Sequence, residues 1–217
     1  MFAIETTADQ AFPLVARDDV TYSPMGESKE PPFIHETALV ETAAIGEGTR
    51  IWAFAHVLKD SVIGSNCNIG DHAFIESGVR IGNNVTIKNG VCVWQHVHIA
   101  DNVFLGPNAV LTNDLTPRSR DADWVPVETW IEEGVTVGAN ATIVCGVRLG
   151  KRCLVGAGAV VTHDVRPHEL VYGNPARHGG WVCFCAQSLK PDLRQIAVCD
   201  RCRRKYTVAG TGVQEVS

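Results

Sequence analysis

One position in every six is large and apolar along most of this chain of 217 residues. Counted from Phe33, fourteen successive positions six residues apart carry Phe, Leu, Ile or Val, as far as Leu111. The same spacing restarts at Ile131 and runs to Val161. Four residues after these anchors stands a small or β-branched residue, such as Ala55. A period of six does not fit an α-helix, but it fits short strands joined by tight turns.

The repeat predicts an all-β chain wound into a parallel β-helix. Side chains alternate between the two faces of a strand, so each anchor and the residue four positions later point into the same interior. Three strands close one coil of eighteen residues, and successive coils stack about 4.8 Å apart as parallel strands. We expect four to five coils in residues 33–111 and about two more in residues 131–165. Such a stack needs a cap at each end.

The segments around the repeat divide the chain. Residues 1–32 lack the repeat and contain several prolines, so we expect an irregular, partly disordered N-terminal arm. The β-helix domain spans residues 33–180, with a projecting loop at residues 112–130. Loops longer than about 15 residues are usually functional or disordered, so this loop is a candidate part of a functional site. A tail with four cysteines occupies residues 181–217.

Composition excludes several other classes of protein. The formal net charge of −5 argues against bulk binding of nucleic acid. No apolar run is long enough to cross a membrane, and the N-terminus does not look like a secretory signal. ATP and NAD binding lack support, because the chain has neither a P-loop nor a G-x-G-x-x-G motif that opens a helix. Cys67 and Cys153 fall at inward positions, which predicts buried thiols in a cytoplasmic protein.

Several stretches of the chain resemble one family of enzymes. They are residues 51–56 (IWAFAH), 68–76 (NIGDHAFIE), 103–108 (VFLGPN), 112–119 (TNDLTPRS), 138–144 (GANATIV), 155–161 (VGAGAVV) and 173–177 (GNPAR). With the repeat and the loop, they make residues 33–185 similar to the left-handed β-helix acyltransferases, and more narrowly to the sugar-nucleotide N-acetyltransferases that acetylate a 3-amino group. The resemblance implies left-handed coils, acetyl-CoA as co-substrate, and a homotrimer with its sites between subunits.

The loop most resembles members that use dTDP-3-amino-3,6-dideoxyhexoses. The alternative is the group that uses UDP-2-acetamido-3-amino-2,3-dideoxyglucuronate, which resembles this chain through Trp52, His56 and residues 174–177. In the resembling enzymes a dedicated general base is not obvious, and an amine with a pKa near neutral needs little help. We therefore expect direct attack of the amine on the thioester, with the leaving thiolate taking the proton.

Three outward corner residues are candidates for catalysis: Asn89, Glu76 and His72. Asn89 matches an Asn of the family's motif and could hold the 3-amino group; the alternative is a turn residue with positive φ. Glu76 could contact the amine or a sugar hydroxyl, or be a solvated acid. His72 could polarise the substrate or accept a proton, or be an interface residue. For His56 we favour a structural or interface role over substrate contact.

Candidates for substrate binding are Trp94, Gln95, Asn113 and Arg118. Trp94 lies eighteen residues after Glu76, so the two should stack on adjacent coils. Trp94 could stack on the nucleotide base, or be interface surface. Gln95 stands where the family often has an acid, and it cannot act as acid or base. The Arg118 guanidinium suits a pyrophosphate, with an anchor of the loop as the alternative.

The resemblance also implies a site for acetyl-CoA on the last coils. The residues expected there are Gly138, Ala141, Ala157, Ala159, Lys151, Pro175 and Arg177. Small side chains on stacked coils would let the pantetheine arm lie against the backbone. The cations, together with Arg152, would meet the adenosine phosphates.

The tail carries two close pairs of cysteines, Cys183 with Cys185 and Cys199 with Cys202. Four thiols so spaced predict a small zinc-ribbon-like unit with a structural Cys₄ site; the alternative is four free thiols in a poorly ordered tail.

Other classes of function stay open. A structural or carbonic-anhydrase-like β-helix would need three converging histidines, and His72, His96 and His98 do not offer that spacing convincingly. A hexapeptide acyltransferase that acetylates a free sugar or serine normally needs a reactive histidine base.

Overall fold

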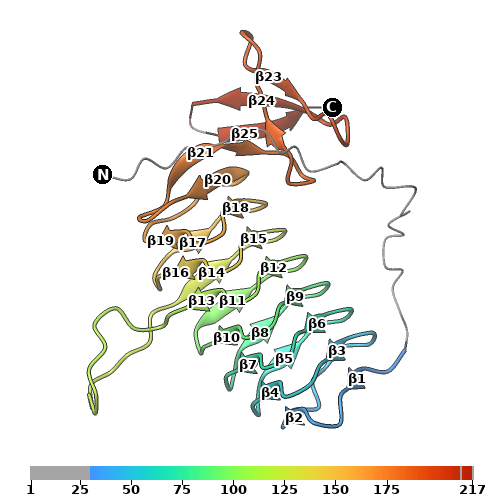
Figure 1. Ribbon diagram of the computed structural model, residues 1–217, viewed down its shortest axis with the longest axis vertical. Helices are drawn as coiled ribbons and strands as arrows, with labels where there is room; N and C mark the ends of the chain where they lie inside the picture. Colours follow the sequence, from blue (N-terminus) through green and yellow to red (C-terminus); the bar gives the residue numbers. More distant parts are fainter. Residues whose placement is uncertain (1–29, 211, 217) are drawn as a thin grey trace, which may run out of the picture.

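The computed structural model describes residues 30–210 and 212–216, and all regular elements of this part are β-strands. Figure 1 shows the strands stacked in a column, with the first coil at one end and an antiparallel sheet at the other. The prediction of a parallel β-helix on a six-residue repeat is confirmed. The predicted N-terminal arm lies mostly outside the described residues.

The described part of the chain contains no helix that is long and apolar enough to cross a membrane.

Three parallel sheets form the walls of the β-helix. The first wall contains β1 (Phe33–Ile34), β3 (Arg50–Ile51), β6 (Asn68–Ile69), β9 (Thr86–Ile87), β12 (Phe104–Leu105), β15 (Thr136–Val137), β18 (Leu154–Val155) and β20 (Glu169–Tyr172). The second wall contains β2 (Leu39–Val40), β4 (His56–Val57), β7 (Phe74–Ile75), β10 (Cys92–Val93), β13 (Val110–Leu111), β16 (Thr142–Ile143) and β19 (Val160–Val161). The third wall contains β5 (Val62–Ile63), β8 (Arg80–Ile81), β11 (Val97–Ile99), β14 (Thr129–Ile131) and β17 (Arg148–Leu149).

The chain turns a corner between successive walls. We name the corner between the first and second walls the first corner, that between the second and third walls the second corner, and that between the third and first walls the third corner. Because each coil passes all three corners in order, residues one coil apart lie on top of one another. This stacking places outward corner residues in columns.

The repeat positions fill the interior. Ile69, Ile75 and Ile87 are fully buried, as are the smaller residues Val85 and Val91 at the second inward position. Burying such a large side chain contributes about 1.5–3 kcal/mol, so the column of anchors is the main stabilising feature of the fold. Interior positions are therefore explained by packing, and chemistry has to come from the outward residues.

The first coil departs from the predicted phase by one residue. Ile34 and Val40, rather than Phe33 and Leu39, pair with the inward residues of the next coil. Phe33 and Leu39 are 47% and 55% exposed. Ile45 follows Val40 by five positions instead of six, so this coil is one residue short. Ile45 pairs with Ile63, eighteen residues later, and the regular repeat continues from there. The prediction of Phe33 and Leu39 as inward anchors is wrong, because the residue after each is also apolar.

The projecting loop is two residues shorter than the predicted 112–130. Pairing resumes at Thr129, so the loop spans residues 112–128. Ile99 pairs with Ile131, 32 residues later, whereas Ile81 pairs with Ile99 after 18 residues. The loop is thus an insertion of fourteen residues into one coil.

The β-helix continues beyond the last in-phase anchor. β20 pairs in parallel with β18, and Leu154 faces Leu170 after sixteen residues instead of eighteen. The shortened coil breaks the six-residue phase, which is why the repeat did not predict this strand.

The tail folds back on this end of the stack. β21 (Arg177–Val182) pairs antiparallel with β20 and spans the boundary expected at residue 180, and β22 (Ser188–Leu189) pairs with β21. A separate antiparallel sheet contains β23 (Ile196–Val198), β24 (Lys205–Ala209) and β25 (Gly212–Val216). The tail has its own apolar cluster around Trp181 and Tyr206.

Candidate active site

The first corner carries a column of residues in the left-handed backbone conformation. Phe54, His72, Gly90 and Asn108 occupy it on four successive coils, with φ between 56° and 73°. The same conformation recurs at the other two corners, as at Asp60 and Asn84, so it belongs to the tight turns of the coil and does not by itself mark a site. His72 is exposed, and its ring centroid lies 5.1 Å from that of Phe54. The corner therefore presents an imidazole and an aromatic ring on the outside of the stack.

Asn89 lies on the same corner, one coil beyond His72. Its side chain is exposed and lies over Gly70, where an added Cβ would come within 2.6 Å of the Asn89 Oδ1. The left-handed position belongs to Gly90, so the alternative role of Asn89 as the positive-φ turn residue is not met. Within the described part of the chain, the Asn89 side-chain amide makes no hydrogen bond. This amide is free to bind a ligand.

Glu76 and Trp94 stack on adjacent coils of the second corner, as their spacing predicts. One carboxylate oxygen of Glu76 accepts a hydrogen bond from the Gln95 backbone N–H at 2.7 Å. The Trp94 indole N–H donates to the Leu111 carbonyl at 2.8 Å, and the ring packs at 5.6 Å from that of Phe74. Trp94 is half-buried and held within its own chain, whereas Glu76 keeps one oxygen for a ligand.

The projecting loop leaves from the second corner too, on the coil after that of Trp94. Its neck is closed by a hydrogen bond from the Val127 N–H to the Asn113 carbonyl at 2.9 Å. Arg118 lies in the exposed part, and its guanidinium donates to the carbonyl of the preceding residue at 3.0 Å. Three apolar side chains of the loop are also exposed, namely Leu115, Trp124 and Val125. Exposed apolar side chains on a projecting loop indicate that it contacts another surface.

His56 lies on the outward face of the second wall, between these two corners. Its Nε2 is 2.8 Å from a Glu41 carboxylate oxygen, and its ring meets that of Phe74 edge-on at 5.6 Å. Leu39 and Val110 are exposed on the same face. The structure thus brings the candidates together as two groups, one on each corner, with a largely apolar strip between them.

The glycine- and alanine-rich stretches stack on the first corner of the last coils. A Cβ on Gly138 would lie 2.5 Å from the backbone nitrogen of Ala157, so coil stacking alone requires glycine there. Ala141 and Ala159 are fully buried, so their methyl groups face the interior and only their backbone can meet a ligand. The peptide bond before Pro175 is cis.

The predicted phosphate-binding cations lie on different parts of the surface. Lys151 and Arg152 are on the third corner, where both approach Glu133, at 3.7 and 3.2 Å. The Arg152 guanidinium also lies 3.7 Å above the Phe184 ring of the tail. Arg177 begins β21, and within the described residues it contacts no carboxylate. Of these three cations, Arg177 is the one without a carboxylate partner among the described residues.

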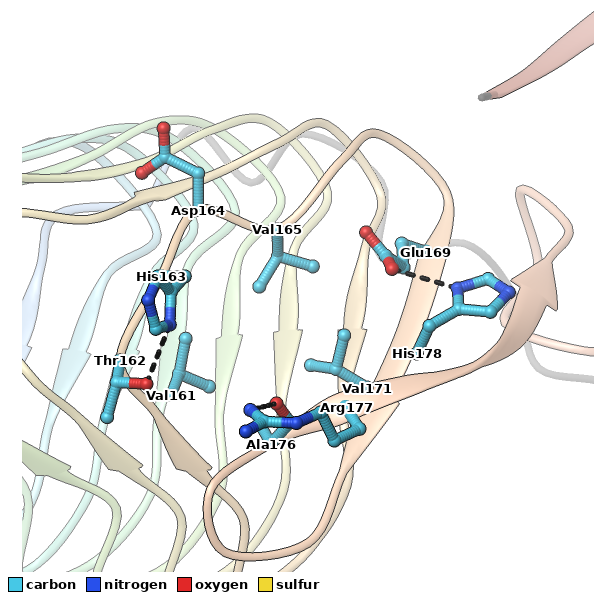
Figure 2. A pocket seen from close by; sticks show the side chains of 10 residues that line it. All are labelled: Val161, Thr162, His163, Asp164, Val165, Glu169, Val171, Ala176, Arg177 and His178. Atoms are coloured by element: carbon cyan, nitrogen blue, oxygen red, sulfur yellow. Dashed lines mark hydrogen bonds and ion pairs between the residues drawn. The ribbon is translucent and has the colours of Figure 1, made fainter. Parts of the chain in front are cut away.

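A cavity of about 190 Å³ opens beside Arg177 at the end of the stack. Figure 2 shows Glu169 in this cavity, bonded to His178, with Arg177 in the same strand as His178. Glu169 is 5% exposed, and Arg166 donates to it at 2.9 Å. Burial raises the pKa of Glu169, but the hydrogen bonds from Arg166 and His178 outweigh burial and hold the pKa at about 2.

Arg166, Glu169 and His178 were not predicted from the sequence, because they follow Val161, the last position of the six-residue repeat. The spacing of Arg166 and Glu169 three residues apart, next to an apolar strand, is the signal that could have found them.

His96, which directly precedes β11, and His98 of β11 do not form a metal site with a third histidine. His96 and His98 lie 3.9 and 3.6 Å from the Glu128 carboxylate, and the His98 ring stacks on Trp130 at 3.9 Å. Across residues 30–210 and 212–216, one group of potential metal ligands converges, and it is the four cysteines of the tail. The carbonic-anhydrase-like alternative therefore finds no support in the described structure.

Comparison with known proteins gives the class. Residues 42–77 and 78–113 match the family model described as bacterial transferase hexapeptide (six repeats), and residues 129–163 match that of the hexapeptide repeat of succinyl-transferase. The chain is 51% identical over 185 residues to the dTDP-3-amino-3,6-dideoxy-α-D-galactopyranose 3-N-acetyltransferase of Aneurinibacillus thermoaerophilus, covering 85% of this chain and 95% of that protein. This chain therefore belongs to the hexapeptide-repeat acetyltransferase family.

More distant relatives share parts of this architecture. The bifunctional protein GlmU of Thermotoga maritima is 32% identical over 187 residues, which cover 82% of this chain but only 32% of GlmU. Among solved structures, a galactoside acetyltransferase in complex with coenzyme A is 24% identical, with a TM-score of 0.51, covering 57% of this chain and 69% of that one. This structural likeness shows a shared fold.

Proposed function

We propose that this protein transfers the acetyl group of acetyl-CoA to the 3-amino group of a nucleotide-linked amino sugar, a dTDP-3-amino-3,6-dideoxyhexose. The observation that carries the proposal is the 51% identity to a 3-N-acetyltransferase over almost all of that relative's length. The competing substrate is UDP-2-acetamido-3-amino-2,3-dideoxyglucuronate.

The reaction needs alignment more than it needs an acid or base. The amine nitrogen attacks the thioester carbon, the C–S bond of the resulting tetrahedral intermediate breaks, and the CoA thiolate leaves with the proton that the nitrogen loses. Alignment of the two reactants can contribute up to about 7–11 kcal/mol, and one N–H donor to the developing oxyanion about 3 kcal/mol more. We assign Asn89 to the 3-amino group, Glu76 to the amine or a sugar hydroxyl, and His72 to polarisation of the substrate.

The two groups of candidates lie on different corners, and a homotrimer would join them. In a closed ring with head-to-tail contacts, the first corner of one subunit meets the second corner of the next. The apolar outward face of the second wall and the exposed apolar tip of the loop are the surfaces that such contacts would cover. Asn89 and His72 would then face Glu76, Gln95 and the loop of the neighbouring subunit.

The acetyl-CoA site would lie along the first corner of the last coils. We place the pantetheine arm against the backbone at Gly138 and Ala157, and the phosphates at Arg177, which has no carboxylate partner among the described residues. Pro175 shapes the turn that leads to Arg177. Lys151 would take part only if the CoA chain reaches the third corner, where Glu133 already engages it.

A substrate panel tests the proposed function. Purified protein is incubated with acetyl-CoA and one sugar at a time: dTDP-3-amino-3,6-dideoxygalactose, its glucose epimer, or the UDP-linked 3-amino uronate. The products are identified by mass spectrometry. We expect acetylation of at least one dTDP sugar at a higher kcat/KM than of the UDP sugar. Failure on all three would reject the proposal, and preference for the UDP sugar would replace the dTDP assignment by its competitor.

Direct attack without a general base has its own test. Loss of a general base typically costs about 10²–10⁴-fold in rate, so we expect folded His72→Gln to lose less than about tenfold in kcat. His56→Gln is the matched second variant, because His56 is held by Glu41 on the wall between the corners. An inert His72→Gln or His56→Gln protein with a wild-type unfolding temperature would contradict the base-free mechanism.

A further inference from the structure

Four cysteines from two separate turns of the tail converge on one point. Cys183 and Cys185 follow β21, and Cys199 and Cys202 follow β23. Their sulfur atoms all lie within 4.8 Å of one another. The separations are 3.2 Å for Cys183 and Cys202, 3.5 Å for Cys185 and Cys199, and 3.7 Å for Cys183 and Cys185. Four cysteines with no common ligand would not be expected to bring all their sulfur atoms to one point.

The size of this group matches a metal tetrahedron. Zinc–thiolate bonds of about 2.3 Å in tetrahedral geometry place the sulfur atoms about 3.8 Å apart. The observed separations of 3.2 to 3.7 Å are close to that value. All four thiols are in the free form in this structure, so each can supply one ligand atom.

The two turns that carry the cysteines have the same unusual backbone. The residue after each second cysteine is left-handed, Ala186 with φ 66° and Arg203 with φ 63°. In each turn the N–H of that residue donates to the carbonyl of the first cysteine, at 2.9 and 3.0 Å. The two matching turns thus bring both pairs of cysteine sulfur atoms to one point.

The surroundings of the group suit an anionic metal centre. Four thiolates around a divalent cation carry a net charge of −2. The Tyr206 hydroxyl lies 3.2 Å from the Cys183 sulfur and accepts the Phe184 backbone N–H. The guanidinium groups of Arg152 and Arg204 lie 3.7 and 4.0 Å from the centre of the ring of Phe184, the residue between Cys183 and Cys185. Each of these cations is also paired with a carboxylate, Arg152 with Glu133 and Arg204 with Glu215, so the Tyr206 hydroxyl is the group that directly contacts a cysteine sulfur.

We propose that Cys183, Cys185, Cys199 and Cys202 bind one zinc ion, and that this metal holds the tail as a cap on the C-terminal end of the β-helix. Thiolate ligands select soft divalent cations such as zinc over magnesium or calcium. Four protein ligands close the coordination sphere, so the metal has no position for a substrate and its role is structural.

Direct contacts join this metal-bearing unit to the last coil. His168 and Val182 exchange backbone and side-chain hydrogen bonds at 2.8 and 2.9 Å, and the His168 ring lies 5.8 Å from that of Tyr206. Arg166 donates to the Gly210 carbonyl at 3.3 Å. A stacked β-helix exposes unpaired backbone and apolar surface at its end, and the tail covers that end. The metal therefore acts on the stability of the end of the stack and not on the chemistry of acetyl transfer.

Metal analysis of the full-length chain tests the site. We expect about one equivalent of zinc per chain after purification, and cobalt(II) exchanged into the site should give the intense visible absorption of a tetrahedral thiolate complex. Cys199→Ser with Cys202→Ser should lose both signals, whereas the matched control Cys92→Ser, a half-buried cysteine of the second wall, should keep them. Less than half an equivalent of zinc together with no cobalt absorption would overturn the proposal, as would zinc retained by the double variant.

Hydrogen exchange tests the capping role without relying on a variant that folds. Removal of the metal from the wild-type chain by a chelator should raise amide exchange at least tenfold in residues 181–209, leave residues 50–110 unchanged, and be reversed by added zinc. Exchange that is the same with and without metal in residues 181–209 would contradict the capping role.

Discussion

Glu169 is a buried acid at the end of the stack, with Arg166 and His178 as its partners. Its pKa of about 2 lies below the ordinary value of 4.5, because hydrogen bonds from Arg166 and His178 outweigh burial. A depressed carboxyl pKa contributes stability that is complete above about pH 5 and is lost as the pH falls toward 2. The shift corresponds to roughly 3 kcal/mol.

Glu169→Gln should therefore lower the free energy of unfolding by roughly 3 kcal/mol at pH 7, and by less than half of that at pH 3. Urea unfolding at both pH values measures the difference. Glu128→Gln, an acid that is 54% exposed, is the control and should change stability by less than about 0.5 kcal/mol. Equal losses in Glu169→Gln at pH 7 and pH 3 would show that the acid is not held in its charged form by its partners.

The side-chain amide of the candidate Asn89 makes no hydrogen bond within the described residues. Replacement by Ala should lower kcat/KM for the amino sugar by about tenfold to a hundredfold, with little change in unfolding temperature, because the amide makes no hydrogen bond within the described residues. Asn84→Ala is the control for kinetics, since Asn84 is an exposed asparagine on the third corner; because its φ is 56°, this variant should lose some stability but no kcat/KM. Steady-state kinetics of both variants give the comparison, and equal losses would remove Asn89 from the site.

The residues of the interior could be predicted from the sequence, whereas the grouping of the outward ones could not. Packing repeats with the coil, so Ile69 and Ile87 are fixed by their period alone. Phe33 fails because its neighbour Ile34 is equally apolar and the period cannot choose between them. Asn89 and Glu76 are both predicted to point outward, and their spacing of thirteen residues puts them on different corners of the coil. The sequence does not show what the two corners contact.

The projecting loop is an insertion into an otherwise regular element. Removal of residues 114–127 deletes fourteen residues and leaves Leu111 and Ile131 six positions apart, which restores the repeat. Because the loop makes few contacts with the coils, we expect the shortened protein to unfold within a few degrees of the wild type. Loss of Arg118 and of the loop tip should lower turnover by at least about a hundredfold.

Thermal unfolding and turnover of this shortened protein are measured together. A shortened chain that keeps more than a tenth of its turnover would show that the loop is not part of the site. Arg118→Ala alone is the matched point variant, and it should raise KM for the nucleotide sugar more than it lowers kcat, since a phosphate contact is made in both ground and transition states.

The strand of the last coil, β20, could not be predicted from the six-residue repeat. β20 occupies its place in the first wall, yet its coil has sixteen residues, so the six-residue period ends before it. Pairing of backbone groups tolerates this shortening because the corner, and not the strand, loses the residues. The six-residue repeat of apolar side chains therefore ends before β20, although the backbone of β20 still pairs in the first wall.

At the scale of the whole molecule, the proposed active site is shared between subunits. Asn89→Ala and Glu76→Ala proteins, each impaired alone, should regain activity when they are unfolded and refolded together. In a ring whose sites combine the first corner of one subunit with the second corner of the next, about a quarter of the sites then contain both native residues. No recovery, in a mixture shown to have exchanged subunits, would place the whole site within one chain.

We propose that the protein acetylates the amine of a nucleotide-linked sugar, and identification of the reaction product is the most direct test. Protein, acetyl-CoA and dTDP-3-amino-3,6-dideoxygalactose are combined, and the product is characterised by NMR while released CoA thiol is counted. We expect one new amide at C3 of the sugar for each thiol released. Acetyl found on a sugar hydroxyl, or thiol released with no acetylated sugar, would contradict it.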